Sequence, residues 1–313
     1  VGGIEADEQV LGLGRHEASQ QLLEPRRRVL GGAAARGCEV GQLHDGHRND
    51  NGGPGRRAAA VRGEERRTGA PVRVAGLESF RVVRMPSALV TGGSSGIGLA
   101  IARMLRDEGF GLTLASRTKE KVEAAAADLG AHAIAADMGK EEDCVRVVAE
   151  HRERFGGMDV LVNSAGIGIA GTVESLQTKH IDLQLGVNLR GLLLVSREAI
   201  PLLKKTRGWI VNLASIAGTA PTPGLTVYGA TKAAVIALTR SQNDELDAAG
   251  VRAIAICPGF VATPMAEWSG LPEDEMITPG DCAEVVRMCL RLSRNARIPQ
   301  VVIERVGAEN LIA

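Results

Sequence analysis

The stretch SALVTGGSSGIGLAIARMLRDEG, residues 87–109, decides the fold. It opens with a continuous apolar run over 87–92, which predicts a buried β-strand. Apolar residues then recur at helical spacing over 96–109, and Gly109 closes the run as a typical helix stop. Closely spaced glycines and two serines separate the two elements. The stretch therefore predicts a strand, a tight glycine-rich turn and a helix in succession.

The same alternation of strand and helix continues to the end of the chain. The further predicted strands are 111–116, 132–137, 158–166, 208–215, 251–259 and 300–305, and the further predicted helices are 119–130, 141–156, 180–205, 225–250 and 282–293. Because the strands are continuous apolar runs, both faces of their sheet should be covered by helices. The sequence predicts an α/β fold with a doubly wound, seven-stranded parallel sheet, which is a Rossmann fold.

The composition changes near Met85. Residues 1–84 contain fourteen arginines, fifteen glycines and no lysine, and they show neither a helical period nor a strand alternation. A segment with so little to bury is expected to be disordered. We predict a disordered Arg- and Gly-rich extension over 1–84, upstream of a natural start at Met85, and one domain over 85–313. Eleven acidic residues in the extension argue against a transit peptide.

Charge and cysteine usage exclude several classes of function. The formal net charge is zero, which disfavours nucleic acid or an anionic membrane as a partner. No apolar run reaches the length of a membrane span. The five cysteines form no CxxC pair, and the HDGHRND stretch (44–50) lacks a recognised ligand spacing, so we predict no metal site. We expect a cytoplasmic protein with free thiols.

The glycine-rich turn TGGSSGIG, residues 91–98, has the spacing G-x-x-x-G-x-G. Small residues let the backbone turn tightly and approach a pyrophosphate. The helix that follows offers free N–H groups and the positive end of its dipole. The loop therefore predicts a dinucleotide site with contacts from Gly92, Ser94, Ser95, Gly96, Ile97 and Gly98.

The end of the second predicted strand indicates which dinucleotide binds. An NAD site usually carries an acidic residue there, which binds the ribose hydroxyls. This chain reads Leu-Ala-Ser-Arg over 114–117 and has no acid. Arg117 can pair with a 2′-phosphate. The sequence therefore favours NADP(H) over NAD(H).

The only tyrosine of the chain, Tyr228, precedes Lys232 by four residues in VYGATKAAV (227–235). Residues four apart share one face of a helix. A lysine ammonium beside a phenol favours the phenolate and lowers its pKa from about 10. The pair predicts an acid/base group that exchanges a proton with a substrate near neutral pH.

Several further motifs accompany this pair in a fixed order. They are Asp137 after the third strand, NSAG (163–166), VNLRG (187–191), Ser215 after the fifth strand, and PGFVATP (258–264) after the sixth. Together with TGGSSGIG and YGATK, they make residues 85–313 resemble a single-domain short-chain dehydrogenase/reductase. One departure is Ser164, where the family often has a second asparagine.

The resemblance implies a role for each matching residue. Tyr228 would be the acid/base, Lys232 would lower its pKa and bind the nicotinamide ribose, and Ser215 would hydrogen-bond the substrate oxygen. Asn188 would hold a water that links Lys232 to solvent. The remaining implied cofactor contacts are Asp137, Asn163, Pro258, Gly259, Val261 and Thr263.

The resemblance also implies hydride transfer between NADP(H) and a ketone, an aldehyde or a secondary alcohol, by a homodimer or homotetramer. Apolar residues after the sixth strand, such as Phe260, Met265 and Trp268, suggest an apolar carbonyl substrate. One alternative is a 3-oxoacyl-thioester reductase of fatty-acid type. Another is a non-catalytic cofactor-sensing regulatory protein.

Overall fold

The structure is a computed structural model of the chain, and it describes residues 84–307. The predictions for the extension 1–84, including the HDGHRND stretch, therefore lie outside the described residues except at Arg84. The guanidinium Nη2 of Arg84 pairs with Asp159 Oδ2 at 2.7 Å. This contact ties the residue before Met85 to the loop that precedes the fourth strand.

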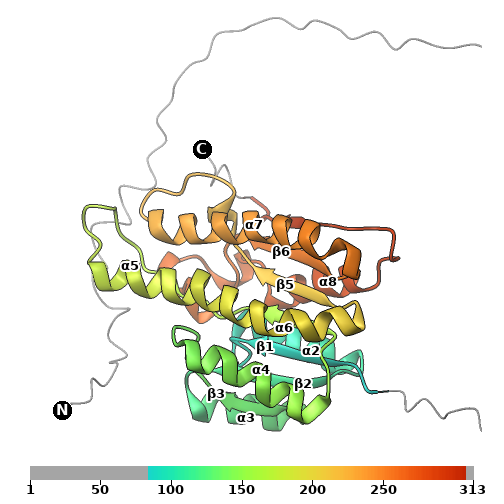
Figure 1. Cartoon of the computed structure of the whole chain (residues 1–313). Helices are drawn as coiled ribbons and strands as arrows, with labels where there is room; N and C mark the ends of the chain where they lie inside the picture. Colours follow the sequence, from blue (N-terminus) through green and yellow to red (C-terminus); the bar gives the residue numbers. More distant parts are fainter. Residues whose placement is uncertain (1–83, 308–313) are drawn as a thin grey trace, which may run out of the picture. The chain divides into compact units, whose positions relative to one another are not determined.

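One parallel sheet of seven strands, in the order β3-β2-β1-β4-β5-β6-β7, forms the centre of the described part of the chain (Figure 1). Its strands are β1 (Ser87–Thr91), β2 (Gly111–Ser116), β3 (His132–Ala135), β4 (Val160–Asn163), β5 (Trp209–Leu213), β6 (Arg252–Pro258) and β7 (Gln300–Ile303). The strand order reverses between β1 and β4, and ligands of such sheets bind at this switch point. The predicted Rossmann fold is confirmed.

Helices cover both faces of the sheet (Figure 1). They are α2 (Gly96–Asp107), α3 (Lys119–Leu129), α4 (Glu141–Phe155), α5 (Thr178–Leu185), α6 (Leu192–Thr206), α7 (Thr226–Leu246) and α8 (Pro279–Leu290). In β1, the side chain of Val90 packs with apolar side chains of α2, α3 and α8. The side chain of the preceding residue, Leu89, packs with apolar side chains of α4 and α6. This alternation explains why the strands read as continuous apolar runs. None of the described helices could span a membrane.

The predicted helix 180–205 is divided in the structure. A π-helical segment, η2 (Gly186–Gly191), separates α5 from α6. Within this segment a Cβ on Gly191 would lie 2.1 Å from the carbonyl oxygen of Met138, so only glycine fits there. The sequence analysis treats the whole stretch as one regular helix and does not predict the wider turn. Such π-segments often occur at functional sites.

The fourth strand is shorter than predicted, and this shapes the site. β4 ends at Asn163, so residues 164–177 form a loop that begins at the carboxyl edge of the sheet. The amide of Ser164 still donates to the Thr91 carbonyl at 3.2 Å, which holds the start of this loop beside the end of β1. The loop therefore starts at the switch point between β1 and β4.

Candidate active site

The turn between β1 and α2 has a backbone that requires glycine. Gly92 has φ +66° and Gly96 has φ +53°, both in the left-handed region. A Cβ on Gly92 would lie 2.8 Å from the amide nitrogen of Ala165, and a Cβ on Gly98 would lie 2.3 Å from the carbonyl oxygen of Gly92. The turn is therefore packed as tightly as the sequence predicts, and it lies against the loop that follows β4.

The N-terminus of α2 leaves backbone donors available to a ligand. Ser95 is the N-cap, and its side chain makes no capping hydrogen bond. The first hydrogen bond of the helix joins the Leu99 amide to the Ser95 carbonyl at 3.1 Å. The amides of residues 96–98 therefore have no partner within the helix. These donors and the positive end of the helix dipole suit a pyrophosphate.

The end of β2 lies beside this turn, because the amide of Gly92 donates to the Ala115 carbonyl at 2.8 Å. The Oγ atom of Ser116 is buried and has no hydrogen-bond partner within residues 84–307. Arg117, the next residue, is exposed. A buried hydroxyl without a partner and an exposed guanidinium are groups that a phosphorylated ribose would satisfy.

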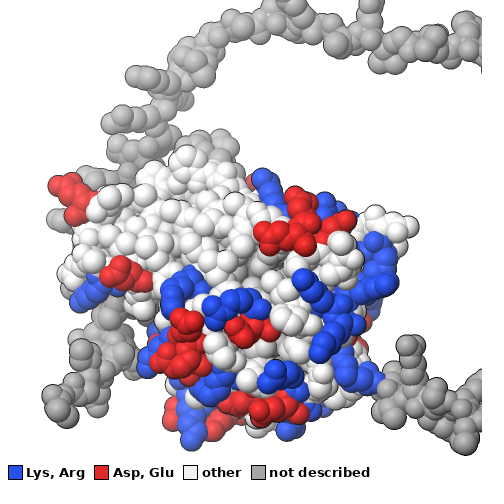
Figure 2. Space-filling view, viewed as in Figure 1, with Lys and Arg blue, Asp and Glu red and all other residues white. Residues whose placement is uncertain are grey.

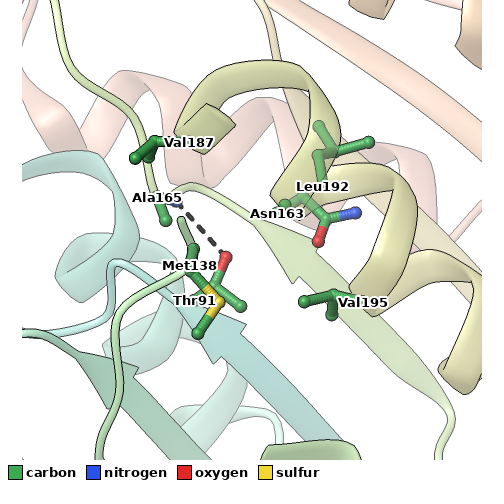
Figure 3. Close-up of a pocket in the computed structure, with 8 residues that line it drawn as sticks. Thr91, Met138, Asn163, Ala165, Val187, Leu192 and Val195 are labelled. Carbon is green, nitrogen blue, oxygen red and sulfur yellow. Dashed lines mark hydrogen bonds between the residues drawn. The ribbon is translucent and has the colours of Figure 1, made fainter. Parts of the chain in front are cut away.

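A narrow hollow lies where β1, β4 and α6 meet (Figure 3). It is too narrow for a water molecule, and its lining includes Thr91 and Asn163. The Ala165 amide donates to Thr91 Oγ1 across it at 3.3 Å. Asn163 is 3 % exposed, and its Nδ2 donates to Ser196 Oγ and Asn212 Oδ1. Only its Oδ1 has no partner among the described residues.

Asp137, Thr263, Pro258 and Val261 also lie at the carboxyl edge of the sheet, and they differ in how firmly other residues hold them. Asp137 Oδ1 accepts the Gly139 amide at 2.9 Å, so this carboxylate also closes the turn after β3. Thr263 lies against the glycine turn, because a Cβ on Gly96 would be 3.0 Å from its Cγ2. Pro258 ends β6, and Val261 is buried in a bridge with Ile277.

The Ser215 hydroxyl lies close enough to the phenol of Tyr228 to act on its pKa, in the direction that lowers it. Ser215 follows β5 and caps the short helix η3 (Ile216–Gly218), where its Oγ accepts the Ala217 amide at 3.2 Å. Tyr228 lies in the first turn of α7 and is half-buried. Two hydroxyl groups that are thirteen residues apart in the sequence therefore face the same point at the carboxyl edge of the sheet.

The pKa of Tyr228 differs from the sequence-based expectation. Burial raises the pKa of the phenol above 10, and the Ser215 hydroxyl lowers it by less. The expected lowering by Lys232 does not appear, because the Nζ atom of Lys232 donates to the Leu213 carbonyl at 2.7 Å. That nitrogen lies 5.6 Å from the centroid of the tyrosine ring. No hydrogen bond joins this nitrogen to the phenol oxygen within the described residues.

Lys232 itself is 5 % exposed, and burial lowers its pKa to about 8. A buried ammonium is disfavoured unless anions or acceptors surround it. A Cβ on Gly166 would lie 3.4 Å from both Lys232 Nζ and Asn188 Oδ1, so these two groups lie next to the same glycine. Lys232 is therefore a buried cation whose charge changes close to neutral pH.

Asn188 links the loop after β4 to the helix that carries Tyr228. Its Oδ1 accepts the Ile167 amide at 2.8 Å, and its Nδ2 donates to the Ile167 carbonyl and to Thr231 Oγ1. The Thr231 hydroxyl donates to the Tyr228 carbonyl at 2.7 Å. The sequence analysis does not predict a role for Thr231, although this residue lies inside the YGATK motif. The Leu213 carbonyl, which accepts from Lys232, cannot be predicted as a site group, because every residue has a backbone carbonyl.

The comparisons with known proteins agree with this geometry. The family model described as short chain dehydrogenase matches residues 86–273. The chain belongs to the short-chain dehydrogenase family. An uncharacterized oxidoreductase of Staphylococcus epidermidis is 36 % identical over 230 residues, which cover 72 % of this chain and 99 % of the relative. One from Staphylococcus aureus is 33 % identical over 223 residues, which cover 70 % of this chain and 96 % of the relative.

Two solved structures of short-chain dehydrogenase type are similar throughout the fold. An alcohol dehydrogenase of Thermococcus sibiricus, complexed with 5-hydroxy-NADP, has a TM-score of 0.66 and 31 % identity, and the match covers 71 % of this chain and 97 % of that one. A 3-ketoacyl-(acyl-carrier-protein) reductase of Brucella melitensis, complexed with NADH, has a TM-score of 0.65 and 31 % identity, with 70 % and 96 % covered. This short-chain dehydrogenase is an NAD(P)-dependent oxidoreductase that acts on small molecules.

Proposed function

We propose that this short-chain dehydrogenase is an NADP(H)-dependent reductase of ketones or aldehydes, with Tyr228 as the acid/base. The observation that carries the proposal is the placement of the Ser215 and Tyr228 hydroxyls beside the buried Lys232, whose Nζ lies 5.6 Å from the centroid of the tyrosine ring. The three side chains lie at the carboxyl edge of the sheet, where β5 and α7 meet. Such a cluster of perturbed titratable groups at a ligand-binding edge is typical of a catalytic site.

Each side chain of this cluster has a definite task in the proposed reaction. The nicotinamide, when bound, supplies the hydride to the carbonyl carbon. Ser215 donates a hydrogen bond to the carbonyl oxygen and stabilises the charge that develops there. Tyr228 gives its proton to the same oxygen. Lys232, on the same face of α7, holds the nicotinamide ribose beside these two hydroxyl groups. Oxidation of a secondary alcohol uses the same residues in reverse.

The choice of NADP(H) is supported by the end of β2. Arg117 is exposed there, and Ser116 Oγ is buried without a partner among the described residues. We propose that these groups bind the phosphorylated ribose and that the turn 92–98 binds the pyrophosphate. We assign the remaining cofactor contacts to Asp137, Asn163, Tyr228, Lys232, Pro258, Gly259, Val261 and Thr263. Because one similar structure carries an NADP derivative and the other NADH, both cofactors belong in the test.

The substrate class is proposed from the segment after β6. The rings of Phe260 and Trp268 pack edge to face, with centroids 5.9 Å apart. Trp268 is 51 % exposed and Met265 is 45 % exposed. Exposed apolar residues in a segment at a ligand-binding edge favour an apolar carbonyl compound. The similarity to a 3-ketoacyl-(acyl-carrier-protein) reductase favours an acyl thioester as the second candidate substrate.

The test is a screen for NADPH consumption over apolar ketones, aldehydes, sugars and 3-oxoacyl thioesters, with NADH in parallel. We expect turnover with at least one apolar carbonyl and with NADPH ahead of NADH. Reduction of thioesters alone would replace the proposal by its second candidate. Tight cofactor binding without turnover of any carbonyl would indicate a cofactor-sensing protein and would contradict the reductase.

We also propose that the protein is a homodimer or homotetramer in the cytoplasm. A broad face over α5 and α7 has few charged residues (Figure 2), and its exposed apolar side chains include Leu183 and Leu185. Beside it, residues of the 217–226 loop and the first turns of α7 line an uncharged groove of about 490 Å³. The four described cysteines are buried free thiols, which suits a reducing compartment. Light scattering of the purified protein tests the assembly, and a monomer would contradict it.

A further inference from the structure

The backbone of residues 166–169 forms a wall beside the proposed acid/base pair. A Cβ on Gly166 would lie 3.4 Å from Lys232 Nζ, and a Cβ on Gly168 would lie 3.6 Å from Cδ2 of Tyr228. The two glycines therefore place bare backbone against the lysine and the tyrosine. A shift of this segment by an ångström would change the space next to the phenol, where a substrate carbonyl has to fit.

Two amide side chains hold the same segment from its other side. Asn188 Oδ1 accepts the amide of Ile167 at 2.8 Å, and Gln184 Oε1 accepts the amide of Ile169 at 3.1 Å. Gln184 at the end of α5 and Asn188 in η2 thus hold two alternate amides of the same segment.

Gln184 is placed where an apolar side chain would be ordinary. It is the only buried residue of α5, and it is 0 % exposed. A buried amide is costly unless it is hydrogen-bonded. Its Nε2 donates to the His180 carbonyl within the same helix at 3.3 Å, so its one bond outside the helix is the bond to Ile169. An apolar side chain could fill this position in α5, but it could not accept the hydrogen bond from the Ile169 amide.

We propose that Gln184 is a positioning residue for the carbonyl substrate, which sets the width of the cleft beside Tyr228. It acts through the backbone of Gly168 and Ile169, together with Asn188. This inference rests on the proposed reductase function. It assigns to Gln184 an effect on the binding of the carbonyl substrate rather than on the binding of the cofactor, whose proposed phosphate contacts lie at the turn 92–98 and at the end of β2.

The test compares Gln184→Leu, which removes the acceptor, with Gln184→Glu, which keeps an oxygen at the same reach. Gln177→Leu is the matched control, because it makes the same change at the exposed N-cap of α5. We expect the leucine variant at position 184 to raise KM for the carbonyl by about tenfold, the value of one lost hydrogen bond. NADPH affinity should stay within about twofold of wild type, because that is within the scatter of neutral surface changes.

Two further readouts separate positioning from a merely structural role. Hydrogen exchange at the Ile169 amide should be fast in Gln184→Leu and slow in wild type and in Gln184→Glu. The glutamate variant should also restore most of the KM. An unchanged KM in Gln184→Leu would overturn the inference. A general loss, in which kcat, NADPH affinity and melting temperature all fall together, would also overturn it, because it would indicate a merely structural role. If Tyr228→Phe remains fully active, the proposed function fails instead, and the hydrogen exchange still reports whether Gln184 holds the loop.

Discussion

The ammonium nitrogen of Lys232 lies 5.6 Å from the centroid of the Tyr228 ring, one helical turn away on the same face of α7. Burial acts on both groups in the direction that disfavours charge: it raises the pKa of Tyr228 and lowers the pKa of Lys232 to about 8. The phenol therefore holds its proton at neutral pH, as a proton donor to a carbonyl must. The lysine is the group of the pair whose charge changes near physiological pH.

The first prediction concerns the pH dependence of cofactor binding. Because Lys232 has a pKa of about 8, it is charged below that pH and neutral above it. An ammonium attracts an anionic dinucleotide, so NADPH affinity should fall as the pH rises from 7 to 9.5, by about tenfold or more. Titration calorimetry at several pH values measures this. Lys232→Met should bind more weakly at pH 7 and show a flat profile, and parallel profiles for the two proteins would contradict the assignment.

The second prediction concerns the choice between the two nicotinamide cofactors. Arg117→Ala removes an exposed guanidinium at the end of β2. If Arg117 binds a 2′-phosphate, NADPH affinity should fall by about tenfold to hundredfold, the range of a hydrogen bond to a charged group. NADH affinity should hardly change. Lys121→Ala is the control, because it removes the same charge from the exposed face of α3. Equal losses for both cofactors would show that Arg117 does not read the phosphate.

The third prediction concerns stability and a buried histidine outside the site. His151 in α4 is 0 % exposed, and its Nδ1 lies 2.9 Å from Thr113 Oγ1 while its Nε2 lies 3.1 Å from the Gly157 carbonyl. Burial lowers the pKa of His151 to about 4, and the charges of Arg84 and His132 act in the same direction. In the unfolded chain its pKa is about 6.5.

The sign of the pH effect follows from these two values. Between pH 6.5 and 4 the unfolded chain binds the extra proton, so the free energy of unfolding falls as the pH falls through this range. The titration of His151 leaves the free energy of unfolding unchanged above pH 6.5 and lowers it by about 3 kcal/mol at pH 4. Urea unfolding of the wild type and of His151→Gln at pH 7 and pH 4 measures it. His151→Gln should lose less stability than the wild type between pH 7 and pH 4. An equal loss in the two proteins would contradict the prediction.

The sequence predicts the fold and the glycine turn well, because both depend on local rules. Gly92 and Gly96 have backbone angles that glycine alone adopts freely, and their spacing is visible in the sequence. The same holds for Tyr228 and Lys232, since a spacing of four residues places both on one helix face. Features that depend on how distant segments pack could not be predicted in this way.

Three residues show where sequence reasoning ends. The pKa of Tyr228 is raised rather than lowered, because burial outweighs the effect of the Ser215 hydroxyl and no residue pattern reports burial. Asn163 carries a recognisable motif, yet its amide nitrogen is used by Ser196 and Asn212 inside the protein. Gln184 lies in an otherwise ordinary helix, and its role depends on a loop that begins where β4 ends.

The most direct test of the central claim is the rate of NADPH oxidation by Tyr228→Phe with the best carbonyl substrate from the screen, measured at saturating cofactor. Phenylalanine keeps the ring and removes only the hydroxyl that we propose as the proton donor. We predict that kcat falls by about 10²- to 10⁴-fold, the usual contribution of a positioned acid, while NADPH affinity is retained. A rate equal to that of the wild type would contradict the assignment of Tyr228 as the proton donor.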